Sequence, residues 1–108
     1  MNYSLGEIVL VKFPFTNLLK SKKRPVLIIK SENELGDIVC FQITSNQEQS
    51  NLLKINHENL HNSTLTVESY VKYDKCFTIN SSIIDKKIAT ANENFLTILK
   101  ERFCNEIF

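Results

Sequence analysis

Short apolar runs separated by polar residues fill the first two-thirds of the chain. Five of these runs are too short for a free-standing helix, and β-branched and aromatic residues dominate four of the five, so they predict β-strands. The predicted strands are Glu7–Phe13, Pro25–Ile29, Ile38–Ile43, Leu52–Ile55, and Tyr70–Tyr73 continued by Phe77–Ile79. The last of them is expected to bend near Asp74.

The polar stretches between these strands predict loops. Pro14 follows the first predicted strand and Pro25 begins the second, so a β-hairpin connection is expected between them, with a long polar loop over Thr16–Lys23. Asn, Gln and Ser, which favour turns, are concentrated in two further predicted loops, Asn46–Asn51 and Asn56–Ser63.

The last third of the chain has the period of a helix. Apolar residues recur every four positions, at Phe95, Leu99, Phe103 and Ile107. This spacing predicts an amphipathic helix, capped by Asn92 or by Thr90 in a capping box with Glu93. Ser81–Asp85 is predicted to be a short helical turn. The apolar stripe is expected to pack on the sheet, with a partner-binding face as the alternative.

Several antiparallel strands followed by one helix predict a mainly β, α+β fold, a small and strongly bent barrel or sheet under a helix. The 108 residues suit a single domain, expected over 1–108. With 43% hydrophobic and 23% charged residues, a wholly disordered or fibrous chain is excluded. No apolar run approaches the ~20 residues of a membrane-spanning helix, and no N-terminal signal pattern is present, so a cytoplasmic location is expected.

Charge and cysteine content narrow the picture further. The net charge of +1 divides into +5 over residues 1–30, −5 over 31–70 and +1 over 71–108. This balance argues against non-specific binding along DNA, but it permits a local basic patch. The alternative interpretation of the patch is a solvent-exposed turn whose lysines only keep the protein soluble. The patch is Lys20, Lys22, Lys23 and Arg24. Three cysteines, odd in number and far apart, are expected to be reduced, mostly buried and structural. They are Cys40, Cys76 and Cys104.

One segment matches a metal-binding pattern. His57–His61 has the form H-E-x-x-H, which places two imidazoles on zinc when it lies in a helix with a third ligand. Asn and Ser around it are poor in helix interiors, and Glu68 is the only nearby third ligand. A chance match in a surface loop is therefore expected. With Gly6 and Gly36 as the only glycines, no glycine-rich phosphate loop exists either.

A second set of residues fits phosphate chemistry. Arg24 opens a predicted strand, and its five-donor guanidinium can grip a phosphodiester and stabilise charge that develops there. Thr44 and Ser45 end the third strand, where hydroxyls can bond the same phosphate. Asp74, between two lysines at the bend, can exchange a proton. Each has a structural alternative: a surface ion pair for Arg24, turn formation for the other three.

Four segments, taken in order, resemble the MazF/PemK toxins, endoribonucleases of bacterial toxin–antitoxin systems. They are Gly6–Thr16 (GEIVLVKFPFT), Lys22–Ile29 (KKRPVLII), Ile43–Ser45 (ITS) and Val71–Lys75 (VKYDK) with Phe77–Ile79 (FTI). The resemblance runs from residue 6 to about residue 103, and its first two segments are the specific part.

The resemblance implies an SH3-like β-barrel of the MazF/PemK/CcdB type that forms a homodimer and binds single-stranded RNA in a groove at the dimer interface. It implies cleavage without metal or cofactor, by attack of the substrate's 2′-hydroxyl, with 2′,3′-cyclic phosphate and 5′-hydroxyl ends. It also implies an antitoxin partner, which would occupy the RNA groove and with which the toxin would bind DNA.

By position, the resemblance implies roles for single residues. Arg24 matches an arginine that contacts the scissile phosphate, Thr44 a catalytic threonine, and Asp74 an aspartate that some branches use as a base. Substrate binding is implied for Phe15, Thr16, Lys20, Lys22, Lys23, Ser45, Asn46 and Lys72.

The chain departs from the family pattern at three places. The loop before Arg24 lacks the glycine of many relatives, Lys72 replaces an arginine of some branches, and the two histidines of the H-E-x-x-H segment receive no role. Two other functions stay open: a toxin of the same fold that acts on DNA gyrase, as CcdB does, and a catalytically silent relative that binds RNA or an antitoxin. Retention of Arg24 and Thr44 favours the nuclease.

Overall fold

A computed structural model of the chain describes residues 3–14, 21–63 and 67–108, with only the backbone described at 13, 14, 21 and 22. Two 3₁₀ turns, η1 and η2, accompany the strands and the helix. In chain order the elements are β1 Glu7–Pro14, β2 Ser21–Lys30, β3 Asp37–Thr44, β4 Leu52–Ile55, η1 His57–Asn59, β5 Leu60–His61, β6 Ser69–Asn80, η2 Ser81–Ile83, β7 Ile84–Ala91 and α1 Glu93–Glu106.

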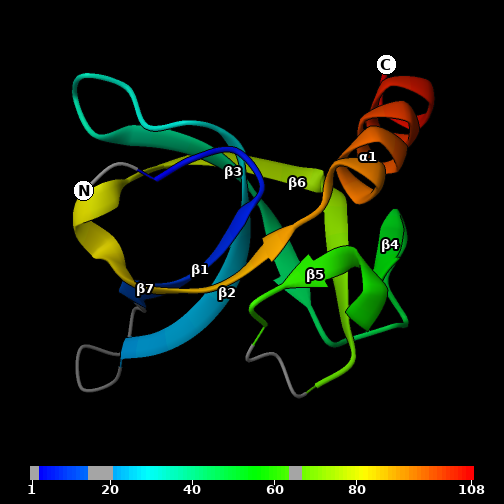
Figure 1. Cartoon of the computed structure of the whole chain (residues 1–108), viewed down its shortest axis with the longest axis horizontal. Coiled ribbons are helices and arrows are strands. Elements are labelled where there is room, and N and C mark those ends of the chain that lie inside the picture. The colour runs from blue at the N-terminus through cyan, green and yellow to red at the C-terminus, as the bar shows by residue number, and fades with distance from the viewer. Residues whose placement is uncertain (1–2, 15–20, 64–66) are drawn as a thin grey trace.

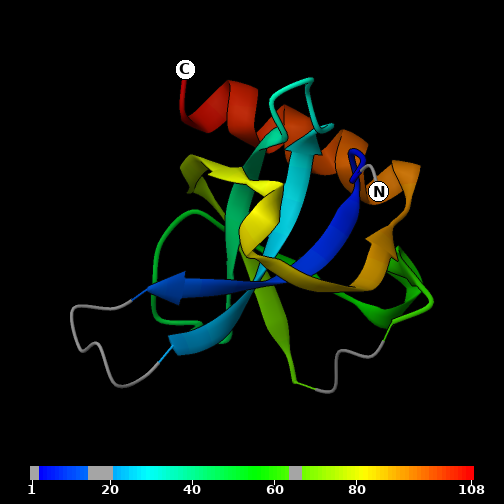
Figure 2. The same ribbon diagram turned by 90° about the vertical axis from the view of Figure 1, so that its left-hand side faces the viewer.

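The described strands form one sheet in the order β4-β6-β3-β2-β1-β7-β5, with every neighbouring pair antiparallel. The sheet curls so strongly that β1, β2, β3 and β7 form a ring in Figure 1. In Figure 2, α1 lies across the top of the strands. The result is the mainly β fold that the sequence predicts, a small and nearly closed barrel with one C-terminal helix.

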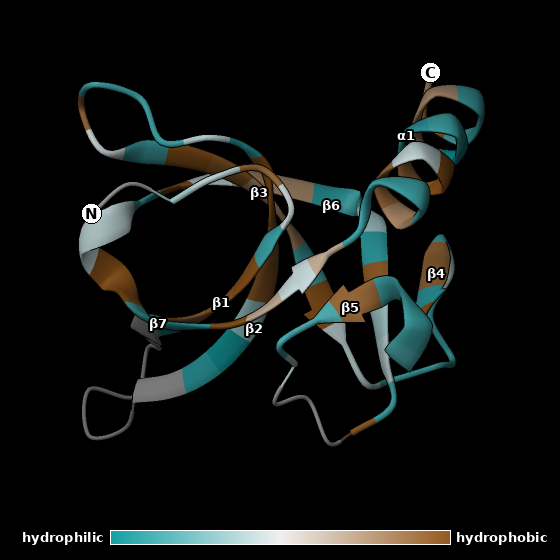
Figure 3. Cartoon of the chain, viewed as in Figure 1, coloured by the Kyte–Doolittle hydropathy of each residue, from teal (hydrophilic) through white to brown (hydrophobic). Residues whose placement is uncertain are grey.

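Each face of the curved sheet carries its own apolar cluster, because successive side chains along a strand point to opposite sides. The η2 face, on the side of the 3₁₀ turn η2, carries Val9, Val11, Val26, Ile28, Ile38, Cys40 and Ile79. The α1 face, on the side of the helix, carries Ile8, Leu27, Phe41, Ile43, Val71, Tyr73, Phe95 and Leu99, among others. Burial on both faces gives the apolar stretches that Figure 3 shows along β1 and β3.

The predicted helix is present, and its apolar stripe packs on the sheet as expected. Asn92 is the N-cap, since its side-chain oxygen accepts a hydrogen bond of 2.9 Å from the amide of Phe95. Thr90 lies inside β7, so the alternative cap at Thr90 is wrong. The stripe is buried at its start and ends in an exposed Ile107, which caps the helix C-terminus. No helix among the described residues is long and apolar enough to cross a membrane.

Two predicted boundaries are wrong, and one strand, β7, is not predicted. The loop predicted over Thr16–Lys23 is shorter, because Ser21 already pairs with Pro14 in the β1–β2 ladder. The turn predicted over Ser81–Asp85 ends at Ile83, and its last two residues begin β7. Sequence alternation misses β7 because its pairing with β1 contains two register shifts, which break the period of two.

The predicted bend near Asp74 is confirmed. Phe41 pairs with Cys76 on β6, but the next residue, Gln42, pairs with Lys72, so the three residues 73–75 bulge out of the β3–β6 register. We call residues 73–75 the β6 bulge.

The cysteines differ from expectation. Cys40 is buried, but Cys76 and Cys104 are exposed, so the prediction that they are mostly buried is wrong. Cys76 lies directly after the β6 bulge, and Cys104 lies on α1 away from the sheet. Burial, with a smaller contribution from Cys76, raises the pKa of the Cys40 thiol to about 12.

Candidate functional site

Arg24 and Thr44 come to the same face of the sheet where β2 and β3 part. The β2–β3 ladder reaches Val26 and Gln42, and Arg24 and Thr44 lie two residues beyond that pair on their strands. Because side chains alternate, both point to the η2 face, as Val26 does. Arg24 is half-buried and lies opposite Val11 of β1 in the register. The aliphatic part of the Arg24 side chain is therefore at the edge of the apolar cluster that contains Val11.

From Thr44, polar side chains continue across the η2 face in two rows set by the strand register. The first row is Thr44, Tyr70 and Lys54 on β3, β6 and β4. The second row is Gln42 and Lys72 on β3 and β6, and it ends at β4, where the apolar Leu52 pairs with Lys72. The η2 face is thus apolar around Cys40 of β3 and becomes polar at the end of β3 that contains Gln42 and Thr44. We call these two rows, with Arg24 and Asp74, the polar strip.

Lys72 and Asp74 form an ion pair within the polar strip. Lys72 Nζ lies 2.8 Å from Asp74 Oδ1 and also donates a hydrogen bond of 3.1 Å to the carbonyl of Ser50. The two residues are two apart on β6, and the β6 bulge carries Asp74. The lysine ammonium is therefore fixed between a carboxylate and a carbonyl, beside the row that contains Thr44.

The loop after Thr44 is fastened to the polar strip by its own polar groups. Thr44 Oγ1 accepts a hydrogen bond of 3.1 Å from the amide of Asn46, and Asn46 Oδ1 accepts one of 3.0 Å from the amide of Glu48. The hydroxyl of Tyr70 donates to Gln47 Oε1 at 3.2 Å. Ser45 and Asn46, which follow Thr44, are exposed at the start of this loop.

The structure does not bring Lys23 to the same face as Arg24. Lys23 lies opposite Lys12 in the β1–β2 register, on the other side of β2, and its Nζ lies 3.0 Å from Asp85 Oδ2. The hydrogen bond from Lys23, helped by its charge, lowers the pKa of Asp85. Lys22 belongs to β2 without a described side chain. The other substrate-binding predictions, Phe15, Thr16 and Lys20, lie outside the described residues.

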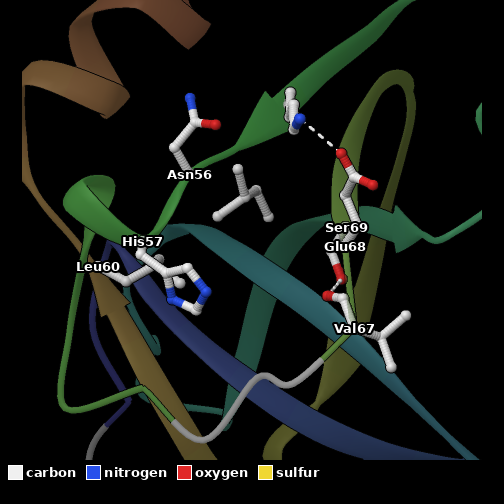
Figure 4. A pocket seen from close by; sticks show the side chains of 8 residues that line it. Asn56, His57, Leu60, Val67, Glu68 and Ser69 are labelled. Carbon is white, nitrogen blue, oxygen red and sulfur yellow. Dashed lines mark hydrogen bonds and ion pairs between the residues drawn. The ribbon is translucent and has the colours of Figure 1, made fainter.

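A pocket of about 290 Å³ opens at the Lys54 end of the polar strip. Figure 4 shows His57 and Glu68 on opposite sides of it. Lys54 and Glu68 form an ion pair, in which a hydrogen bond raises the pKa of Lys54 and lowers that of Glu68. The pocket is lined by Lys54, Ile55, Asn56, His57, Leu60, Val67, Glu68 and Ser69.

The H-E-x-x-H segment lacks the geometry of a zinc-binding helix. His57 begins the 3₁₀ turn η1, whereas His61 lies in β5 opposite Thr90, and both histidines are exposed. The two imidazoles are therefore not one α-helical turn apart. Within the described part of the chain, no three His, Cys, Asp or Glu side chains are grouped as metal ligands.

Sequence reasoning missed Tyr70, Lys54 and Gln42 as members of the strip. A signal for them exists in the strict alternation from Glu68 to Tyr73, in which polar residues at 68, 70 and 72 interleave with buried ones at 69, 71 and 73. The cross-strand register that places them beside Thr44 depends on the tertiary structure and could not be predicted from the sequence.

The fold defines a class of small antiparallel β-barrels with one C-terminal helix, and in this chain one face of the barrel presents Arg24, Thr44 and the Lys72–Asp74 pair. Solved structures share this fold. A MazE–MazF complex from Deinococcus radiodurans aligns with a TM-score of 0.78 at 16% identity over 97% of this chain and 95% of that one. The Mycobacterium tuberculosis toxin MazF-mt6 aligns with a TM-score of 0.69 at 20% identity over 92% and 93%.

An endoribonuclease in complex with its cognate antitoxin, from a mycobacterial species, aligns with a TM-score of 0.73 at 12% identity over 97% of this chain and 92% of that one. A search of curated proteins gives no match. The family model described as "PemK-like, MazF-like toxin of type II toxin-antitoxin system" matches residues 4–107. The chain belongs to this family of toxins.

Proposed function

We propose that this toxin is a metal-independent endoribonuclease that cleaves single-stranded RNA. The observation that carries the proposal is the polar strip, which places Arg24, Thr44 and the Lys72–Asp74 pair on one face of the sheet. Those are the groups that cleavage of a phosphodiester by a neighbouring hydroxyl requires: a cation for the developing charge, a hydroxyl to orient the phosphate, and a carboxylate to take a proton. RNA brings the nucleophile itself.

In the proposed reaction, the 2′-hydroxyl attacks the adjacent phosphorus and the bond to the 5′ oxygen breaks. Asp74 takes the proton of the 2′-hydroxyl, and the departing 5′ oxygen takes a proton from water. The guanidinium of Arg24 binds two non-bridging oxygens and stabilises their added negative charge. The products are a 2′,3′-cyclic phosphate and a 5′-hydroxyl. DNA lacks the attacking hydroxyl and is expected to stay intact.

The remaining residues of the strip are assigned to substrate binding. Thr44 accepts from Asn46, and its own O–H remains a donor that can bond the phosphate. Lys72 uses two of its three N–H donors on Asp74 and Ser50, and the third can reach an RNA oxygen. A role for Lys23 in RNA binding stays a prediction. An RNA phosphate would have to compete with the Asp85 carboxylate for the Lys23 ammonium.

A cognate antitoxin and a second copy of the chain are the proposed partners. Two of the similar structures contain a MazF-type toxin or an endoribonuclease together with its antitoxin, which supports an antitoxin for this toxin as well. Such an antitoxin would cover the polar strip and block access of RNA. RNA as the substrate places the toxin in the cytoplasm.

The test is cleavage of a single-stranded RNA oligonucleotide in excess EDTA, with an all-deoxy version of the same sequence as a negative control. Arg24→Ala is expected to lower the rate at least ~100-fold, the scale for loss of a transition-state donor. Lys30→Ala is the matched control, because it removes a cation from the exposed far end of the same strand. Thr44→Val is expected to lower the rate and Thr44→Ser to restore most of it.

Unchanged cleavage by Arg24→Ala would overturn the assignment. Toxicity with intact cellular RNA would instead favour a toxin of this fold that acts on another macromolecule, such as DNA gyrase. Binding of RNA without cleavage would identify a catalytically silent relative.

A further inference from the structure

We propose that Tyr73 and Glu106 are positioning residues that hold the β6 bulge, and with it Asp74, in place for cleavage. Their hydrogen bond would couple the last turn of α1 to the polar strip on the opposite face of the sheet. The inference rests on the proposed nuclease function, and it names a contact that lies outside the strip.

Tyr73 is the link between the two faces. Its side chain is 2% exposed and belongs to the apolar cluster under α1, whereas its neighbours Lys72 and Asp74 form their ion pair on the η2 face. The hydroxyl of Tyr73 donates a hydrogen bond of 2.8 Å to Glu106 Oε1. A buried tyrosine hydroxyl needs such a partner, because an unpaired one would lose its bonds to water without replacement.

The β6 bulge depends on contacts of this kind. Residues 73–75 are outside the register that pairs β6 with β3, so that ladder does not fix them. The amide of Tyr73 instead donates to the carbonyl of Asn51 at 3.1 Å, and its hydroxyl reaches Glu106. Two hydrogen bonds thus hold Tyr73, one from its backbone amide to Asn51 and one from its side-chain hydroxyl to Glu106. A shift of Tyr73 moves Asp74, the next residue, by a comparable distance.

The helix end is itself anchored. Phe103, one turn before Glu106, packs against Phe41 of β3 with a ring-centroid distance of 5.3 Å. Arg102 Nε lies 3.9 Å from Glu106 Oε2, which leaves Oε1 for the tyrosine. Glu106 therefore reaches the β6 bulge from a helix turn that is fixed to the sheet.

The expected signature is an effect on the chemical step rather than on RNA binding. Misplacement of a reacting group by about 1 Å can cost up to ~100-fold in rate. Loss of one tether that leaves the fold intact should cost less, about tenfold in kcat. KM should stay within about twofold, because Arg24 binds the phosphate from β2 and not from the bulge.

The experiment compares Tyr73→Phe, Glu106→Ala and the double variant in the RNA cleavage assay. Each single variant is expected to lower kcat about tenfold, and the double variant no further, since both remove the same bond. Glu106→Gln keeps an oxygen acceptor and is expected to restore most of the activity. Glu101→Ala, at an exposed position of the same helix, is the matched control.

A second measurement does not depend on catalysis. Hydrogen exchange of the Tyr73 amide, which donates to Asn51, is expected to speed up in Tyr73→Phe and Glu106→Ala but not in Glu101→Ala. If the wild type does not cleave RNA, the proposed function fails while this exchange still decides whether the tether exists. Unchanged exchange would overturn the tether. A lower melting temperature with unchanged kcat would overturn the positioning role and leave a structural one.

Discussion

Lys72 and Asp74 approach to 2.8 Å at the point where β6 leaves the register of β3, and the lysine side chain is only 15% exposed. Ion pairs on an open surface contribute little to stability, about 0–1 kcal/mol. This pair differs because the ammonium also bonds the Ser50 carbonyl and has little access to water. It fixes a carboxylate and a cation next to Thr44, so it shapes the site more than it stabilises the fold.

Replacement of Asp74 tests whether this carboxylate takes part in the reaction. Asp74→Asn keeps the size of the side chain but removes the proton acceptor, and we expect the cleavage rate to fall at least ~100-fold, the usual scale for loss of a general base. Lys75→Ala, at the next and exposed position of the same bulge, is the control. Single-turnover cleavage measures the effect. A rate within twofold of the wild type would leave Asp74 a structural role only.

The ion pair between Lys23 and Asp85 predicts a pH-dependent stability. The hydrogen bond from Lys23 lowers the pKa of Asp85 below its ordinary value of 3.8, so the pair stabilises the folded state above that pH. This contribution is lost as the pH falls through the lowered pKa, where the carboxylate becomes protonated.

Asp85→Asn should therefore melt at a lower temperature than the wild type at neutral pH, and the gap should close in strong acid. Thermal unfolding followed by circular dichroism across this range measures it. Glu34→Gln, at an exposed turn position, is the control and should show no such trend. A gap that persists at the acid end would contradict the linkage.

The three thiols should differ in reactivity. Burial raises the pKa of Cys40 to about 12, which leaves it protonated and shielded at pH 8. Cys76 and Cys104 are exposed, and partial burial also raises the pKa of Cys76, so its alkylation should speed up as the pH increases. Iodoacetamide followed by peptide mass spectrometry is expected to label these two in the native protein and all three after unfolding. Labelling of Cys40 at a comparable rate in the native protein would refute its burial.

Much of the secondary structure is predictable from local pattern. The runs around Val9, Leu27 and Val39 are apolar on both faces and form central strands, and the stripe that begins with Phe95 forms the helix. The elements that sequence misses are those whose pattern is interrupted. β7 carries charged residues at 85–87 and two register shifts, and β5 has only two residues.

The sequence by itself determined most of the strands of the barrel and its helix, the bend at Asp74, and the family-like order of segments that carries Arg24 and Thr44. Those features depend on residue type and on spacing along the chain. Tertiary structure alone decided which side chains share a face: it separated Lys23 from Arg24, paired Lys72 with Asp74, and joined Tyr73 to Glu106. The physical reason is that strand register and bulges arise from pairing between distant segments, and a shift of one residue in that pairing moves a side chain to the opposite face of the sheet.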